Sequence, residues 1–323
     1  MSMILSCAFA TSRDSHEHAL VAEQLGYQHA WFYDSPALYA DVWVQMCRAA
    51  ERTSTIGLGP AVLVPNLRHP MTNAAALSTL VDIAGAERVA VTIGSGFTGR
   101  LTLGQRPLKW AYVADYVRTL RGLLAGEEMT WEGKQIQMMQ PEGFAPARPI
   151  DVPILIAAAG PKGMQCAREL GDGVFTTQPA GDAEVARNPV LTMGTVLDVD
   201  ENAGSARALA AAGHGAAVAL HMALEFGNEE ALPNGAAWAA AYAGVPPAQR
   251  HLALHDQHLV AVNERDRPFV TGPLLEQLGL AMPAEAWRER LQQMQARGTT
   301  EVVYQPAGDD IPRELEAFAK VMT

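Results

Sequence analysis

Short apolar runs alternate along most of the chain with longer stretches in which apolar residues recur at helical spacing. The runs that predict strands are residues 4–10, 29–34, 56–64, 88–96, 153–158, 173–178, 195–199 and 301–305. The stretches that predict helices are residues 16–25, 42–52, 71–84, 109–124, 162–170, 205–226, 285–297 and 313–321. Strands that alternate with helices indicate parallel βαβ units, because parallel neighbours need a crossover connection.

The eight predicted strands, most of them followed by a helix, favour a (β/α)8 TIM barrel, an α/β fold that typically takes about 250 residues. The chain has 323 residues, so we expect one barrel domain over residues 1–323 with insertions at about 127–150 and 227–283. In the first insertion, two alternating arms around Glu132-Gly133 predict a β-hairpin over residues 129–139. A doubly wound open sheet is the alternative. Its dinucleotide-binding form has GxGxxG after the first strand, where this chain has Thr11-Ser12-Arg13.

Charge and composition restrict the partners. The chain carries 35 Asp and Glu against 24 Lys and Arg, a net charge of −11, so we expect neither nucleic acid nor a membrane as partner. Three cysteines without a CxxC pair, and a first segment without a basic leader, predict a cytoplasmic protein. The Ala-rich helices are compatible with a homodimer and equally with an internal core.

One loop after a predicted strand has the composition of a phosphate site. Glycine backbone N–H groups and the start of a helix together attract an anion. The residues of this loop are Ala159, Gly160, Pro161, Lys162 and Gly163. Thr176 and Thr177, which end the next predicted strand, can add hydroxyl donors. An ordinary Gly-Pro helix start is the alternative.

A second loop, after the fourth predicted strand, is dense in glycine. It contains Gly94, Gly96, Phe97 and Thr98 but no Lys-Ser or Lys-Thr, so it is not a Walker loop. Glycines beside an aromatic residue suggest a flat ligand lying close to the backbone. Arg100 and Arg106 follow and can pair with an anionic ligand or within the loop.

Three residues are candidates for proton transfer: Asp34, His69 and His255. Asp34 ends the second predicted strand, where a helix-capping or loop carboxylate is about as plausible. His69 precedes the third helix; a histidine in a loop is more often structural than catalytic, but this place favours contact with a ligand. On a helix, the spacing of His251, His255 and His258 would place all three on one face. Without HExxH or a cysteine pair we expect them to line a polar cavity, and no metal is predicted.

Taken in order, several segments resemble the luciferase-like monooxygenase superfamily, including its methylenetetrahydromethanopterin-reductase-like branch. The segments that carry the resemblance are residues 23–34, 68–70, 94–100, 148–163 and 169–174. The resemblance spans the whole chain and implies a (β/α)8 barrel that binds coenzyme F420 or FMN. It also implies a phosphate site at residues 160–163 and 176–177, and a non-prolyl cis peptide under the ring at Ala61 and Val62.

The chain departs from this branch at three places. Its first predicted strand, in residues 6–10, lacks the carboxylate of the reductase. The chain also has Asp34-Ser35 where related deazaflavin enzymes often have Asp-His, and Phe97 where several place an acidic residue. If the reaction needs acid–base catalysis, we then expect it from Asp34, His69 or the histidines of residues 251–258. The resemblance implies hydride transfer between the cofactor and a small organic substrate. The alternatives are an FMN-dependent monooxygenase, a metal-dependent hydrolase of the barrel class and a flavin carrier without turnover.

Overall fold

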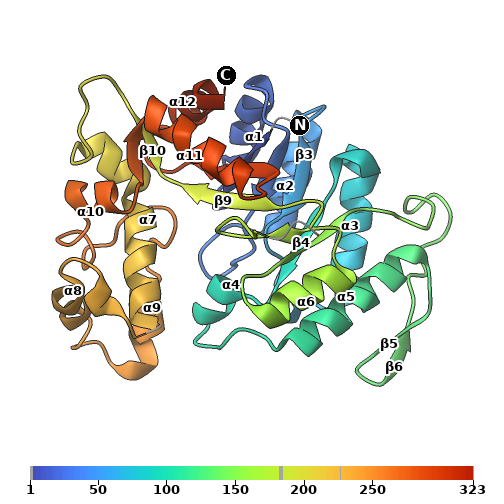
Figure 1. Ribbon diagram of the computed structural model, residues 1–323. Coiled ribbons are helices and arrows are strands. Elements are labelled where there is room, and N and C mark those ends of the chain that lie inside the picture. The colour runs from blue at the N-terminus through green and yellow to red at the C-terminus, as the bar shows by residue number, and fades with distance from the viewer. Residues whose placement is uncertain (1–2, 182–184, 226, 323) are drawn as a thin grey trace.

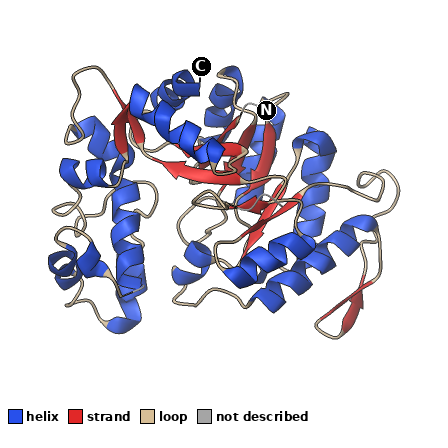
Figure 2. Ribbon diagram, viewed as in Figure 1, coloured by secondary structure: helices blue, strands red, loops and turns tan. Residues whose placement is uncertain are grey.

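Eight parallel strands form a closed barrel in the computed structural model, which describes residues 3–181, 185–225 and 227–322 (Figures 1 and 2). The barrel strands are β1 (Ile4–Phe9), β2 (His29–Phe32), β3 (Gly57–Pro60), β4 (Val91–Gly94), β7 (Ile154–Ala157), β8 (Val174–Phe175), β9 (Pro189–Met193) and β12 (Glu301–Gln305). A five-stranded sheet, β3-β2-β1-β12-β9, and a three-stranded sheet, β4-β7-β8, make up the ring. Parallel bridges between Leu63 and Ile93 and between Thr176 and Val190 join them at both edges. The predicted (β/α)8 TIM barrel is confirmed.

The helices that follow the strands lie outside the ring (Figure 2). They are α1 (Ser15–Gln24), α2 (Val42–Arg52), α3 (Pro70–Ala84), α5 (Trp110–Ala125), α6 (Pro161–Leu170), α11 (Ala284–Ala296) and α12 (Ile311–Met322). Local chemistry sets several of their ends: Asp41 caps α2 by accepting from the N–H groups of Trp43 and Val44, and Gly126 ends α5 in the left-handed conformation. None of the described helices is both long and apolar enough to span a membrane.

The seventh barrel strand differs from its prediction. The strand expected at residues 195–199 is β10 (Thr195–Leu197), which pairs outside the barrel with β11 (Ala281–Pro283). The barrel strand is β9, immediately before it. Gly194 separates the two strands at φ +136°, and a side chain there would meet the carbonyl oxygen of Leu280 at 2.5 Å. One apolar run therefore forms two strands, because a single glycine redirects the chain.

Residues 198–280 make an excursion beside the barrel (Figure 1, left). It contains α7 (Ala206–Glu225), α8 (Gly235–Ala241), α9 (Arg250–Leu254) and α10 (Gly272–Gln277). The last residue of the predicted helix at 205–226, Phe226, lies outside the described residues. Trp238, Tyr242, Leu274 and Leu275 pack on the Ala-rich face of α7 and give the excursion an apolar core of its own. The second expected insertion, residues 227–283, lies here, and we call those residues the insert.

The first expected insertion contains a β-hairpin formed by β5 (Met129–Trp131) and β6 (Lys134–Ile136). Trp131 of β5 packs edge-on against Tyr112 and Tyr116 of α5 and so attaches the hairpin to the outside of the barrel.

The short helix α4 (Phe97–Leu101) follows β4.

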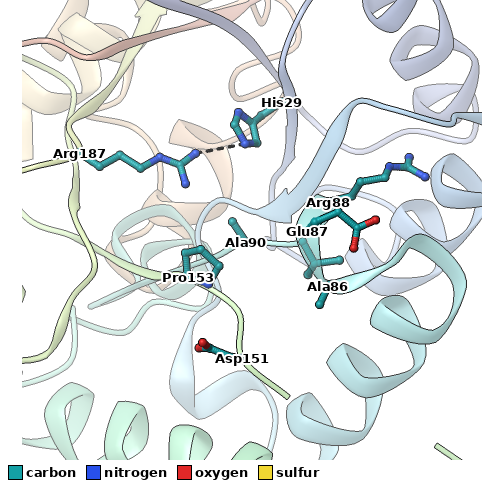
Figure 3. A pocket seen from close by; sticks show the side chains of 9 residues that line it. His29, Ala86, Glu87, Arg88, Ala90, Asp151, Pro153 and Arg187 are labelled. Atoms are coloured by element: carbon teal, nitrogen blue, oxygen red, sulfur yellow. Dashed lines mark hydrogen bonds between the residues drawn. The ribbon is translucent and has the colours of Figure 1, made fainter. Parts of the chain in front are cut away.

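A buried carboxylate joins β12 to β2 and to the residues before β9 at the amino end of the barrel. Glu301, the first residue of β12, is fully buried; it accepts from Arg187 at 3.0 Å and from the indole N–H of Trp31 at 3.1 Å. Arg187 also lies 3.3 Å from His29, and both side chains line a cavity of about 240 Å³ (Figure 3). The amino end of such a barrel usually contributes stability rather than chemistry. We therefore interpret this ion pair as structural.

We expect Arg187→Met to lower the free energy of unfolding by about 3 kcal/mol, because it leaves the fully buried Glu301 carboxylate without its cation. Urea denaturation followed by circular dichroism measures the change. The matched control is Arg288→Met, which removes an exposed pair with Glu285 and should cost less than about 1 kcal/mol. Equal losses in the two variants would contradict the structural role of Glu301.

Candidate active site

The carboxyl end of the barrel is lined by small residues and aromatic rings. Ala8, Ala61, Tyr33 and Phe175 belong to the apolar cluster inside the ring, with Ala157 packed against it. The hydroxyl of Thr92 is buried there and has no hydrogen-bond partner among the described residues. Small side chains and an unpartnered buried hydroxyl are compatible with a site for a flat polar ligand.

The peptide bond between Ala61 and Val62 is cis, and neither residue is proline. It follows β3 directly, where Ala61 N–H donates to the carbonyl of Phe32 at 2.8 Å. A Cβ on Gly94 would lie 3.2 Å from both the Val62 side chain and the Ala157 methyl group. The cis bond therefore occurs at the two residues that the family resemblance implied, next to a position that favours glycine.

The glycine loop, residues 94–100, turns back over this bond. Gly96 has φ +83°, and a Cβ there would come within 2.4 Å of the Val64 side chain, so the turn requires glycine. Thr98 lies in α4, and its hydroxyl is 3.3 Å from Nε2 of His258 in the insert. Arg100 donates to the backbone carbonyl of Arg106, so it bonds within the loop. Of the predicted ligand residues here, Thr98 is the one brought against the insert.

The predicted phosphate loop leads into α6 as the sequence suggested. Ala159, Gly160, Pro161 and Lys162 are exposed, and the first turn of α6 carries no acidic residue. A Cβ on Gly160 would meet nothing within 4 Å. The first N–H groups of a helix have no partner within it, so this end of α6 can receive an anion.

The two threonines of the predicted phosphate site differ in their surroundings. Thr176 is buried, and its hydroxyl accepts from the side-chain amide of Asn188 at 2.9 Å. Thr177 is exposed. A hydroxyl that already accepts one bond can still donate its proton, so both threonines can donate to an anion.

We expect Gly163→Ala to destabilise the protein by about 1–3 kcal/mol, because the new methyl group would lie 2.5 Å from the Trp110 ring and 2.8 Å from the Ala158 methyl group. Thermal unfolding measures the loss. Gly244→Ala is the control: a Cβ there has no neighbour within 4 Å, and we expect a change below about 0.5 kcal/mol. A Gly163→Ala variant as stable as the control would show that this helix start is loosely packed.

Asp34 is buried beside Arg68. Both carboxylate oxygens accept from the Arg68 guanidinium at 2.7 Å, and the other end of the guanidinium contacts Asp41. Burial raises the pKa of Asp34, while the hydrogen bonds from Arg68 oppose the rise. The paired Asp34 ties the loop after β2 to the loop after β3. This geometry favours a positioning role, and proton transfer by Asp34 stays a prediction.

His69 caps helix α3. Its Nδ1 accepts from the N–H of Met71 at 3.1 Å, and its ring lies edge-on to Trp131 of the hairpin. The side chain is exposed. This geometry gives His69 a structural role as a helix cap, and a chemical role stays a prediction.

His255 belongs to a buried group of imidazoles. The rings of His255 and His258 lie 4.9 Å apart between centroids, and the His221 ring lies 6.3 Å and 5.9 Å from them. The expectation that His251, His255 and His258 share one helix face is wrong. Helix α9 ends at Leu254, and φ is +60° at Gln257. In the part of the chain that the structure describes, no three His, Cys, Asp or Glu residues have a geometry that could hold a metal ion.

Asp266 and His221 are important residues of this group that the sequence did not single out as a pair. The Asp266 carboxylate is fully buried and accepts from Trp238, Tyr242, His221 and Asn263. Burial disfavours its ionisation, yet these donors hold the pKa of Asp266 below its ordinary value. The donors lie 3 to 45 residues away along the chain, so no local motif marks them.

Comparison with known proteins places the chain in a family. The model for the luciferase-like monooxygenase family matches residues 7–301, so the chain belongs to that family. A 5,10-methylenetetrahydromethanopterin reductase from Archaeoglobus fulgidus is 30% identical over 176 residues, 53% of this chain and 51% of the relative. An F420-dependent glucose-6-phosphate dehydrogenase from Kineococcus radiotolerans is 30% identical over 181 residues, 51% of this chain and 52% of the relative. The chain therefore matches only about half the length of these relatives.

Solved structures with the same fold cover nearly the whole chain. The coenzyme F420-dependent tetrahydromethanopterin reductase from Methanopyrus kandleri gives a TM-score of 0.69 at 19% identity, covering 99% of this chain and 98% of that one. An F420-dependent secondary alcohol dehydrogenase gives 0.64 at 18% identity, with the same coverage. Likeness at this identity establishes the fold.

Proposed function

We propose that the protein is an oxidoreductase that transfers hydride between coenzyme F420, or FMN, and a small organic substrate. The observation that carries the proposal is the start of α6, which is open in front of Gly160 and has no acidic residue in its first turn, so that it can receive the phosphate of such a cofactor. The relatives named as F420-dependent enzymes support the deazaflavin over FMN. When bound, either cofactor supplies a ring atom that takes or gives the hydride.

The residues present fit such a cofactor at both of its ends. The start of α6 is exposed, free of carboxylates and open in front of Gly160, which suits the phosphate. The flat ring would be held by the backbone at Ala61, Val62, Gly94 and Gly96, with Phe97 and Thr98 beside it. The buried interior of the barrel excludes water from this surface, which favours hydride transfer over side reactions.

Proton transfer is assigned to the insert side of the site. His255 is linked to the glycine loop indirectly, because its ring neighbours His258, which lies 3.3 Å from the Thr98 hydroxyl. Asp34 and Arg68 would hold the two adjoining loops in place. The substrate is a small organic molecule that this geometry does not specify further.

Two other activities are the alternatives. The family name favours a monooxygenase that uses reduced FMN and oxygen. A metal-dependent hydrolase would need a ligand set that the described residues do not assemble.

The test is to compare F420 and FMN on the same preparation. We expect fluorescence titration to give a Kd for F420 at least about tenfold below that for FMN, because the relatives point to the deazaflavin. Small alcohols, sugar phosphates and methylene-carrying pterins are then screened for changes in the F420 absorbance. Tight FMN binding with oxygen consumption would select the monooxygenase, and no binding of either cofactor would refute the proposal.

A charge placed at Gly160 tests the phosphate site. The backbone there is extended, with φ −100° and ψ 167°, and precedes α6, so Asp and Asn both fit as helix caps. We expect Gly160→Asp to weaken F420 or FMN binding at least about tenfold through repulsion of the phosphate, with thermal stability retained. Gly160→Asn, its neutral counterpart, should change the Kd less than about threefold. Equal Kd values for the two variants would show that the phosphate of the cofactor does not bind at this loop.

A further inference from the structure

We propose that residues 255–259 form a latch that closes the carboxyl end of the barrel while His255 and His258 are neutral, and that protonation of these two histidines opens it. The opening is a property of the chain itself. Its consequence for ligand entry rests on the proposed function, since the ligand is the cofactor or substrate of that site.

Three hydrogen bonds fasten the latch to three different parts of the barrel. The Tyr39 hydroxyl donates to the carbonyl of His258 at 2.6 Å, and the Gln305 amide donates to the carbonyl of Leu259 at 2.8 Å. His258 Nε2 lies 3.3 Å from the hydroxyl of Thr98 in the glycine loop. The segment is therefore attached to the loop after β2, to the last residue of β12 and to α4.

The latch also occupies the end of the barrel with a side chain. Leu259 packs on the apolar cluster inside the ring, the same cluster to which Ala61 and Tyr33 belong. Tyr33 in turn donates to Gln305 at 2.8 Å, so Gln305 joins the latch to the barrel wall. In this proposal, a ligand that enters from this end displaces Leu259.

The latch can leave without dismantling the barrel. The excursion has its own apolar core around Trp238, Tyr242 and Leu274. Within the latch, Gln257 and Leu259 have φ of +60° and +61°, a conformation that costs side-chain-bearing residues energy. Contacts with the barrel hold this backbone, and their loss would let it relax.

The histidines make closure depend on charge. The ionisable and polar groups facing His255 and His258 are His214 and His221 on α7, His251 on α9, Tyr39 and Thr98 on the barrel side, and Asp266 behind His221. Nδ1 of His258 is buried and has no hydrogen-bond partner among the described residues. Asp266 already accepts four hydrogen bonds. A proton added to the closed latch would thus place a positive charge among closely spaced imidazole rings.

The direction of the pH effect follows from the pKa values of the two histidines in the closed and in the open latch. Burial, with help from the neighbouring imidazoles, lowers the pKa of His258 to about 2, and burial also lowers the pKa of His255. In the open latch both would return to the ordinary value of about 6.5. The closed latch is therefore stable above pH 6.5 and loses stability as the pH falls below it. Between pH 7.5 and pH 5 the protonation of His258 alone should favour opening by about 30-fold, and His255 acts in the same direction.

Hydrogen exchange of the full chain without cofactor measures the opening. After correction for intrinsic exchange rates, we expect the protection of residues 250–266 to fall at least about 30-fold from pH 7.5 to pH 5, while that of residues 301–305 in β12 stays unchanged. Protection of residues 250–266 that is equal at both pH values would overturn the proposal. So would a parallel loss in β12, which would mean global unfolding.

Matched variants distinguish the effect of protonating His255 and His258 from the effect of losing their hydrogen bonds. His258→Gln keeps a polar group toward Thr98, and His255→Asn keeps one toward the carbonyl of His251, but neither side chain takes up a proton in this range. The double variant should show less than about threefold change over the same pH interval. If its pH dependence equals that of the wild type, the two histidines are not the sensors.

The link to ligand entry is tested at constant pH. Tyr39→Phe removes one latch hydrogen bond and should raise both the exchange rate of residues 250–266 and the association rate of F420 or FMN several-fold. Faster exchange with unchanged association would refute gating and leave the opening intact. If neither cofactor binds the wild type, the proposed function fails, and the exchange result still decides the latch.

Discussion

The pairing of the first strand with the last determines where everything else lies. β1 pairs with β12 from Ile4–Glu301 to Cys7–Tyr304, and this pairing closes a ring in which all eight strands run in the same direction. Their carboxyl ends must then meet at one rim, so loops that are far apart in the sequence become neighbours. The buried Glu301 reinforces this closure, because its partners come from β2 and from the residues before β9. The glycine loop, the cis bond and the start of α6 are brought together by this geometry.

Much of the fold was predictable because its signals are local. Apolar runs separated by helical periods gave seven of the eight barrel strands close to their observed positions, and β12 coincides with its prediction. The exception arose where Pro189–Met193 and Thr195–Leu197 follow each other with only Gly194 between them. Both segments are apolar, so the pattern alone does not say which one enters the ring. That choice depends on Leu280 and Trp287, which crowd Gly194 from distant parts of the chain.

The features of the candidate site also fall into two groups, those with a local signal in the sequence and those that depend on long-range contacts. Glycines at the ends of strands are visible in the sequence, and the family resemblance implied the cis bond at Ala61–Val62, which the structure contains. Other features depend on long-range contacts, such as Arg68 on Asp34, 34 residues away, and His258 against Thr98, 160 residues away. Helical spacing was misleading for the histidines because Gln257 and Leu259 adopt positive φ without being glycine. Sequence patterns do not mark such positions, because tertiary contacts impose them.

The parallel pairing of β10 with β11 affects how residues 198–280 can change during evolution. Thr195 lies opposite Ala281 and Leu197 opposite Pro283, so the chain leaves the barrel and returns to it at neighbouring points. Residues 198–280 are thus held between two adjacent ends and carry a core of their own. Such a segment can be lengthened, shortened or exchanged between related proteins without altering the ring. Changes in the excursion can therefore accumulate while the carboxyl rim of the barrel stays constant.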